Sequence, residues 1–86
     1  MNAFEESIQP NPFLKALLLD AVENQVRDKT PPEAGEALAR LKAAGISEEQ
    51  AKEKIAAVML KYLCTTLHDG VPFDGKAYAQ DLKQLT

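Results

Sequence analysis

The sequence is poor in cysteine, in long apolar runs and in excess positive charge. Its single cysteine excludes an intramolecular disulfide and is typical of proteins from a reducing cytoplasm. No apolar run approaches the ~20 residues that a membrane-spanning helix needs. Residues 1–6 are acidic and lack the basic start and apolar stretch of a signal peptide. We therefore expect a cytoplasmic protein with no membrane partner.

The charge balance argues against nucleic acid as a partner. The net charge is −3 and the isoelectric point is about 5.0, whereas domains that grip phosphates usually carry a basic face. The chain also has no glycine-rich phosphate loop, nucleophile elbow or His-Glu-x-x-His element. We therefore expect no enzyme activity, no catalytic residues and no cofactor.

The length and composition predict one globular domain over residues 1–86. A chain of 86 residues leaves no room for a second core, and 45% of the residues are hydrophobic. Residues 1–10 have few apolar anchors beyond Phe4 and Ile8, so we expect a loose N-terminal segment there.

Helix start and stop signals divide the rest of the chain into four helices. The predicted helices cover residues 12–28, 31–44, 48–68 and 75–85. Their predicted N-caps are Asn11, Thr30, Ser47 and Asp74, with Thr30 in a capping box three residues before a glutamate. Gly45 and Gly70 are the expected left-handed ends of the second and third helices. Because no alternating strand pattern occurs and the connections are short, the predicted fold is all-α, a small antiparallel bundle of four helices.

The first helix is apolar around most of its circumference. In so small a bundle, few residues are left to surround such a helix, so part of its surface is expected to lie in an interface. A symmetric homodimer is the commonest way to cover a spare apolar face. The interface candidates are Leu14, Leu18, Leu19, Val22 and Val26.

A composite of short motifs resembles an uncharacterised bacterial family, a domain of unknown function. The resemblance covers residues 11–85 and rests on Asn11-Pro12-Phe13-Leu14, Val22-Glu23-Asn24-Gln25, Pro31-Pro32-Glu33, Arg40-Leu41, Gly45, Ala51, Ile55, Pro72-Phe73-Asp74, Tyr78, Leu82 and Leu85. It implies an all-helical fold and supplies no known activity.

That family's pattern has histidines at four positions where this chain has Lys15, Leu19, Glu49 and Glu53, and its glutamate matches Glu23. Histidines spaced four apart on two helices, together with a carboxylate, could hold a transition metal. Here the nitrogen ligands are gone, and Glu23, Glu49 and Glu53 are the only metal candidates left. We expect these glutamates to be solvated surface charges and the protein to bind no metal.

Two other candidates, a site at His68 and Cys64 and a helix-turn-helix, are explained more simply by structural roles. His68 falls in the last turn of its helix, where a partial negative charge favours it, and Cys64 with His68 supplies only two of the ligands that zinc needs. Residues 41–51 resemble the turn of a helix-turn-helix, but the following helix opens with Glu48 and Glu49, which would face DNA phosphates.

The predicted function is therefore a small non-catalytic helical protein that acts through protein–protein association with itself or another protein. The alternatives are a metal-binding protein descended from a His/Glu site and a DNA-binding helix-turn-helix.

Overall fold

A computed structural model describes residues 12–86. Asn11 and the predicted loose segment 1–10 lie outside the described residues. The described part contains four α-helices and no strand: α2 (Pro12–Asp28), α3 (Pro32–Ala43), α4 (Glu48–Asp69) and α5 (Gly75–Gln84). The predicted all-α bundle of four helices is confirmed, and each predicted helix end lies within one residue of the observed one. No helix in residues 12–86 combines the length and the apolar character needed to cross a membrane.

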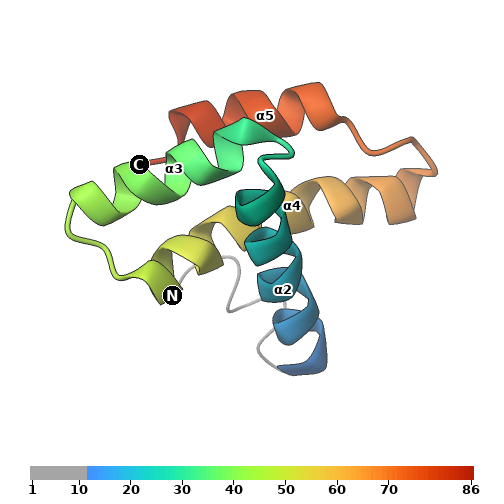
Figure 1. Ribbon diagram of the computed structural model, residues 1–86. Helices are drawn as coiled ribbons and strands as arrows, with labels where there is room; N and C mark the ends of the chain where they lie inside the picture. The colour runs from blue at the N-terminus through green and yellow to red at the C-terminus, as the bar shows by residue number, and fades with distance from the viewer. Residues whose placement is uncertain (1–11) are drawn as a thin grey trace.

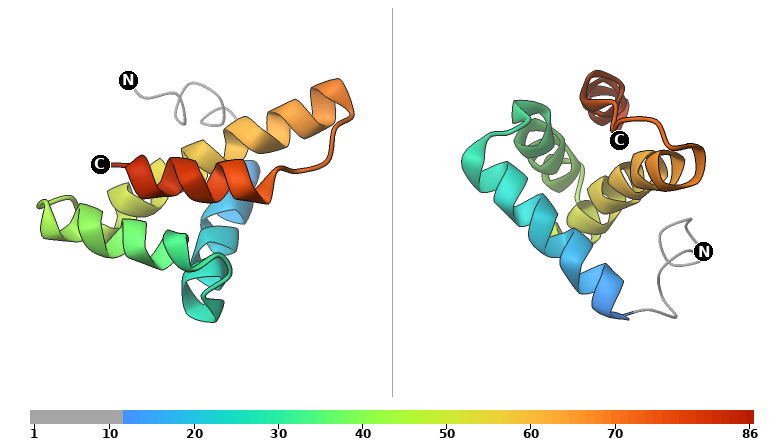
Figure 2. Two further views of the ribbon diagram at one scale, coloured as in Figure 1. Left: turned by 90° about the horizontal axis from the view of Figure 1, so that it is seen from above. Right: turned by 90° about the vertical axis from the view of Figure 1, so that its right-hand side faces the viewer.

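Three helices are roughly aligned and the fourth crosses them. Figure 1 shows α3 and α4 running in opposite directions, with α5 returning beside α3. Helix α2 runs steeply across α3 and α4, as the two further views in Figure 2 also show. The antiparallel arrangement expected from the short connections therefore holds for α3 with α4 and for α4 with α5, but not for α2. Helices α3 and α4 each contact the other three described helices.

Four of the predicted helix signals work as the sequence suggests. The Ser47 hydroxyl accepts a hydrogen bond from the Gln50 amide, and the Asp74 carboxylate accepts one from the Ala77 amide. Gly45 and Gly70 have φ angles of +93° and +71°, which residues with a Cβ atom rarely adopt. Local sequence therefore accounts for both ends of α4, for the start of α5 and for the turn after α3.

The predicted Thr30 cap is wrong. Pro31 is the N-cap of α3 and has no side chain that could accept a hydrogen bond. Thr30 instead belongs to the end of α2: its amide donates to the Gln25 carbonyl (3.1 Å), and its hydroxyl donates to the Asp28 carbonyl (3.0 Å). Lys29 between them adopts φ +56°, the left-handed conformation of a helix stop. The capping box was misassigned because a lysine, not a glycine, occupies that stop.

This difference gives a paired prediction. Ser47→Ala should lower the free energy of unfolding by about 1 kcal/mol, because it leaves an amide at the start of α4 without its acceptor. Thr30→Ala should change the free energy of unfolding by less than about 0.5 kcal/mol, because it removes only an exposed hydroxyl donor. Urea denaturation of the two variants beside the parent protein measures both values. Equal losses in the two variants would contradict the observed start of α3.

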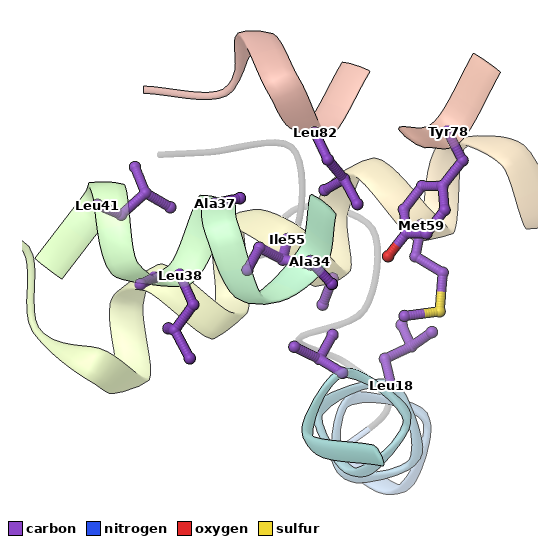
Figure 3. Close-up of a cluster of buried hydrophobic side chains, with 12 residues drawn as sticks. Leu18, Ala34, Ala37, Leu38, Leu41, Ile55, Met59, Tyr78 and Leu82 are labelled. Atoms are coloured by element: carbon purple, nitrogen blue, oxygen red, sulfur yellow. The ribbon is translucent and has the colours of Figure 1, made fainter. Parts of the chain in front are cut away.

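One cluster of buried side chains joins the four helices of residues 12–86. Its members are Leu18, Val22, Ala34, Ala37, Leu38, Leu41, Ala51, Ile55, Ala56, Met59, Tyr78 and Leu82. In Figure 3, Leu18 of α2 points toward Met59 of α4, and Leu82 descends from α5. Four of the twelve are alanines, whose small side chains let neighbouring helices approach closely.

Polar contacts fasten the last helix to this core. The Arg40 guanidinium of α3 donates to the Leu82 carbonyl (2.6 Å) and the Leu85 carbonyl (2.9 Å) at the end of α5. The buried Tyr78 hydroxyl of α5 donates to Gln25 Oε1 of α2 over 2.7 Å. Burial raises the pKa of Tyr78 to about 12. Helix α5 therefore makes hydrogen bonds to two helices that are far from it in sequence, α3 and α2.

Candidate functional site

The predicted interface residues of α2 do not form one exposed surface. Leu18 and Val22 are 4% and 0% exposed and belong to the core of the protomer. Leu14, Leu19 and Val26 are partly buried and pack against that core. Leu18 and Val22 are therefore corrected from interface to core residues, because the crossing of α2 over α3 and α4 turns their row inward.

The exposed apolar surface of α2 lies on another row. Phe13 is 73% exposed and Leu17 is 53% exposed. They are four residues apart in a helix and so lie on one face. Ala16 and Asp20 are also exposed and adjoin them on this side of the helix. We call Phe13, Ala16, Leu17 and Asp20 the outer face of α2.

Sequence periodicity missed the outer face for a definite reason. Both rows of α2 carry leucines, so hydrophobicity alone does not distinguish the inner row from the outer one. A usable signal was present: the row that begins at Phe13 and Leu17 continues to Asp20 and Asn24, whereas the row of Leu14 and Leu18 continues to Ala21 and Gln25. A charged group along a row marks its solvent side.

Two ion pairs join α2 to α4. Lys15 Nζ lies 3.0 Å from Glu53 Oε1, and Lys52 Nζ lies 2.8 Å from Glu23 Oε1. The hydrogen bond from Lys52 and its charge lower the pKa of Glu23, and the same bond raises the pKa of Lys52. The Glu53 side chain is only 13% exposed, so it is not the freely solvated charge that the sequence suggested.

These pairs bear on the metal candidates Glu23, Glu49 and Glu53. The first and the last of them are each held by a lysine of the other helix, and Glu49 is exposed. Within residues 12–86, no three histidine, cysteine or carboxylate side chains gather where they could hold a metal ion. The structure thus does not bring the three glutamates together as a ligand set. Lys15 and Glu53 occupy two positions where the resembled pattern has histidine, and here they form an ion pair.

His68 and Cys64 lie on the surface near the end of α4. The His68 side chain is 90% exposed, and its Nδ1 atom lies 2.7 Å from Asp69 Oδ1. Cys64 is a free, exposed cysteine. General acid–base catalysis needs such groups to converge on a pocket. Neither residue lines either of the two hollows described for residues 12–86.

The first hollow, of about 330 Å³, lies where α2, α3 and the start of α4 meet. It is lined by Glu23, Val26, Arg27, Leu38, Glu48 and Lys52. Its charged side chains are engaged in ion pairs, Glu23 with Lys52, Arg27 with Asp28, and Glu48 with Lys42. Each charged side chain that lines the hollow is therefore already paired with a side chain of opposite charge.

The helix-turn-helix alternative meets a packing obstacle. A recognition helix must present one face to the DNA major groove. Helix α4 instead contacts the other three described helices and buries Ala51, Ile55, Ala56 and Met59 against them. Its first turn carries Glu48 and Glu49, whose charges repel phosphates.

An aromatic and acidic cluster joins α4 to α5. The Tyr62 hydroxyl donates a 2.5 Å hydrogen bond to Asp81 Oδ2, and Lys61 Nζ lies 3.2 Å from the same oxygen. The hydrogen bond to Asp81 raises the pKa of Tyr62 to about 12. The hydrogen bonds that Asp81 accepts from Tyr62 and Lys61 lower the pKa of Asp81. The Tyr62 ring also packs edge-on against Phe73 and Tyr78.

The Tyr62 contact predicts a loss of stability at alkaline pH. Between the ordinary value of 10.0 and the folded value of about 12, the folded protein keeps a phenol proton that the unfolded chain releases. The Tyr62 contribution is therefore complete below pH 10 and is lost as the pH rises through 12. Urea denaturation across this range should show a steeper decline for the parent protein than for Tyr62→Phe. Parallel declines would show that Tyr62 does not contribute.

We compared the chain with known protein families, curated proteins and solved structures. A scan against protein-family models found no match, and searches of curated proteins and of solved structures found none either.

Proposed function

We propose that this protein is a non-catalytic helical protein that acts by self-association through the outer face of α2. The observation that carries the proposal is the joint exposure of Phe13 and Leu17 on one face of a helix whose other side forms the core. A Phe–Leu pair one turn apart is costly to leave in water and is typical of a contact surface. The single cysteine favours a reducing compartment, and we place this association in the cytoplasm.

A symmetric dimer uses such a face efficiently. In a two-fold interface the same patch contributes from both copies, so Phe13 and Leu17 are each buried twice. Fully burying one large apolar side chain contributes about 1.5–3 kcal/mol. Ala16 lies beside these residues and its small side chain lets a second helix approach closely, while the charged Asp20 bounds the patch.

The test is the oligomeric state of the full chain. We expect the parent protein to sediment as a concentration-dependent dimer and Leu17→Glu to sediment as a monomer with unchanged helical circular dichroism. Leu67→Glu is the matched control, because Leu67 is 84% exposed but lies on α4. It should leave the dimer intact.

Two outcomes would overturn the proposal. A parent protein that remains a monomer at the highest attainable concentration has no self-association to explain. A dimer that survives Leu17→Glu but dissociates with Leu67→Glu would place the contact on α4.

A further inference from the structure

A second apolar surface runs along the C-terminal half of α4. Ala57, Leu60, Cys64 and Leu67 follow Glu53 at spacings of three and four residues, so the five share one face of the helix. Leu67 is 84% exposed and Cys64 is exposed, whereas Ala57 and Leu60 are partly buried and pack against the core. Figure 1 shows this half of α4 continuing beyond its crossing with α2. We call Ala57, Leu60, Cys64 and Leu67 the α4 stripe.

The position of the stripe relative to α2 follows from one ion pair. Glu53, at the head of the stripe, contacts Lys15 of α2 over 3.0 Å. Pro12, the first residue of α2, precedes Lys15 by one helical turn. Pro12 therefore lies one helical turn from the residue that contacts the head of the stripe.

We propose that residues 1–11 of this chain bind the α4 stripe, with Phe4 and Ile8 as the apolar contacts. The proposal concerns a surface other than the outer face of α2 and does not depend on dimer formation. Its basis is the length of the segment, the place where it joins α2 and its two large apolar residues, four positions apart.

The spacing of the two apolar residues suits the stripe. Ile8 and Phe4 precede Pro12 by four and eight residues, so an extended chain carries them up to ~13 Å and ~26 Å away from it. Along α4, Leu60 and Leu67 lie ~10 Å and ~21 Å beyond Glu53. The reach of the extended segment is therefore of the same order as the length of the stripe.

The thiol of Cys64 reports whether the stripe is covered, because it is the only cysteine in the chain. The full-length double variant Phe4→Ser/Ile8→Ser removes the apolar contacts without shortening the chain. With 5,5′-dithiobis(2-nitrobenzoate) as the probe, its Cys64 should react about fivefold faster than that of the parent protein, because the stripe is more often open. Asn2→Ser/Gln9→Ser, in the same segment, should react at the parent rate.

Two results of this measurement would overturn the proposal. Equal rates in the parent protein and in Phe4→Ser/Ile8→Ser would mean that the segment does not cover the stripe. A parent rate that rises on dilution would identify a second copy as the occupant. Such a result would leave the association through Leu17 to be judged by its own sedimentation test.

A second measurement keeps the apolar residues and so does not depend on how the double variant folds. Ser7→Cys places a thiol beside Ile8, and mild oxidation at low protein concentration should join it to Cys64 within one chain. Thr86→Cys, at the other end of the sequence, is the control and should form no such bond. Failure of Ser7→Cys to form more of the intrachain disulfide than Thr86→Cys would contradict the proposal.

Discussion

Replacing Leu82 with alanine should lower the free energy of unfolding by about 3 kcal/mol, the largest loss that we expect from one substitution. Leu82 is 0% exposed and contributes to the core from α5. That helix has only 10 residues, and helices shorter than ~12–15 residues are marginal in water without tertiary packing. The substitution therefore both opens a cavity and weakens the docking of a helix that depends on that side chain.

Urea denaturation followed by circular dichroism measures this loss, with Val71→Ala as the control. The control shortens an aliphatic side chain that is 43% exposed and lies between α4 and α5, so its effect should stay within about 0.5 kcal/mol. A loss below about 1 kcal/mol for Leu82→Ala would mean that α5 does not pack on the core as described. Early loss of helix before the main transition would show that α5 undocks separately.

Replacing Arg40 with methionine should cost about 2 kcal/mol, because it removes two charge-assisted hydrogen bonds to the last carbonyls of α5. The guanidinium donates to the Leu82 carbonyl over 2.6 Å and to the Leu85 carbonyl over 2.9 Å. A cation also lies favourably beside the partial negative charge at a helix C-terminus. Methionine keeps much of the aliphatic stem, so the loss reports on the polar contacts.

Two further variants separate geometry from charge. Arg40→Lys keeps the cation but lacks the planar fork that reaches two carbonyls at once, so it should recover less than half of the loss. Arg27→Met is the control for charge: Arg27 is largely exposed and pairs with its neighbour Asp28, and its loss should be under about 0.5 kcal/mol. Full recovery by lysine would show that charge at the helix end suffices without two-point contact.

The helices and most of their ends were predictable because their causes are local. Pro12, Gly45 and Gly70 act on the backbone around them, and the caps Ser47 and Asp74 bind amides three residues away. Thr30 shows the limit of such patterns. Its sequence has the capping-box pattern of a helix start, but Thr30 binds the end of α2 instead. Lys29 adopts the left-handed conformation there, and a lysine gives no sequence signal for it as a glycine would.

The candidate surface was only half predictable. The sequence indicated that α2 is too apolar to be covered on every side, and the exposed Phe13 and Leu17 agree with that expectation. It named Leu18 and Val22 among the contacts, and these are core residues. Leucine has the same hydrophobicity on either row of a helix, so only the helices that cross α2 decide which row is buried.

The sequence by itself determined the four helices of residues 12–86, most of their boundaries and an all-α fold, because hydrogen bonds and caps within a few residues specify them. The tertiary structure decided the steep crossing of α2, the pairing of Lys15 with Glu53 and of Glu23 with Lys52, and the grip of Arg40 on α5. Those contacts join residues 29 to 45 positions apart. They depend on the direction in which one helix packs on another, and no short motif records that direction.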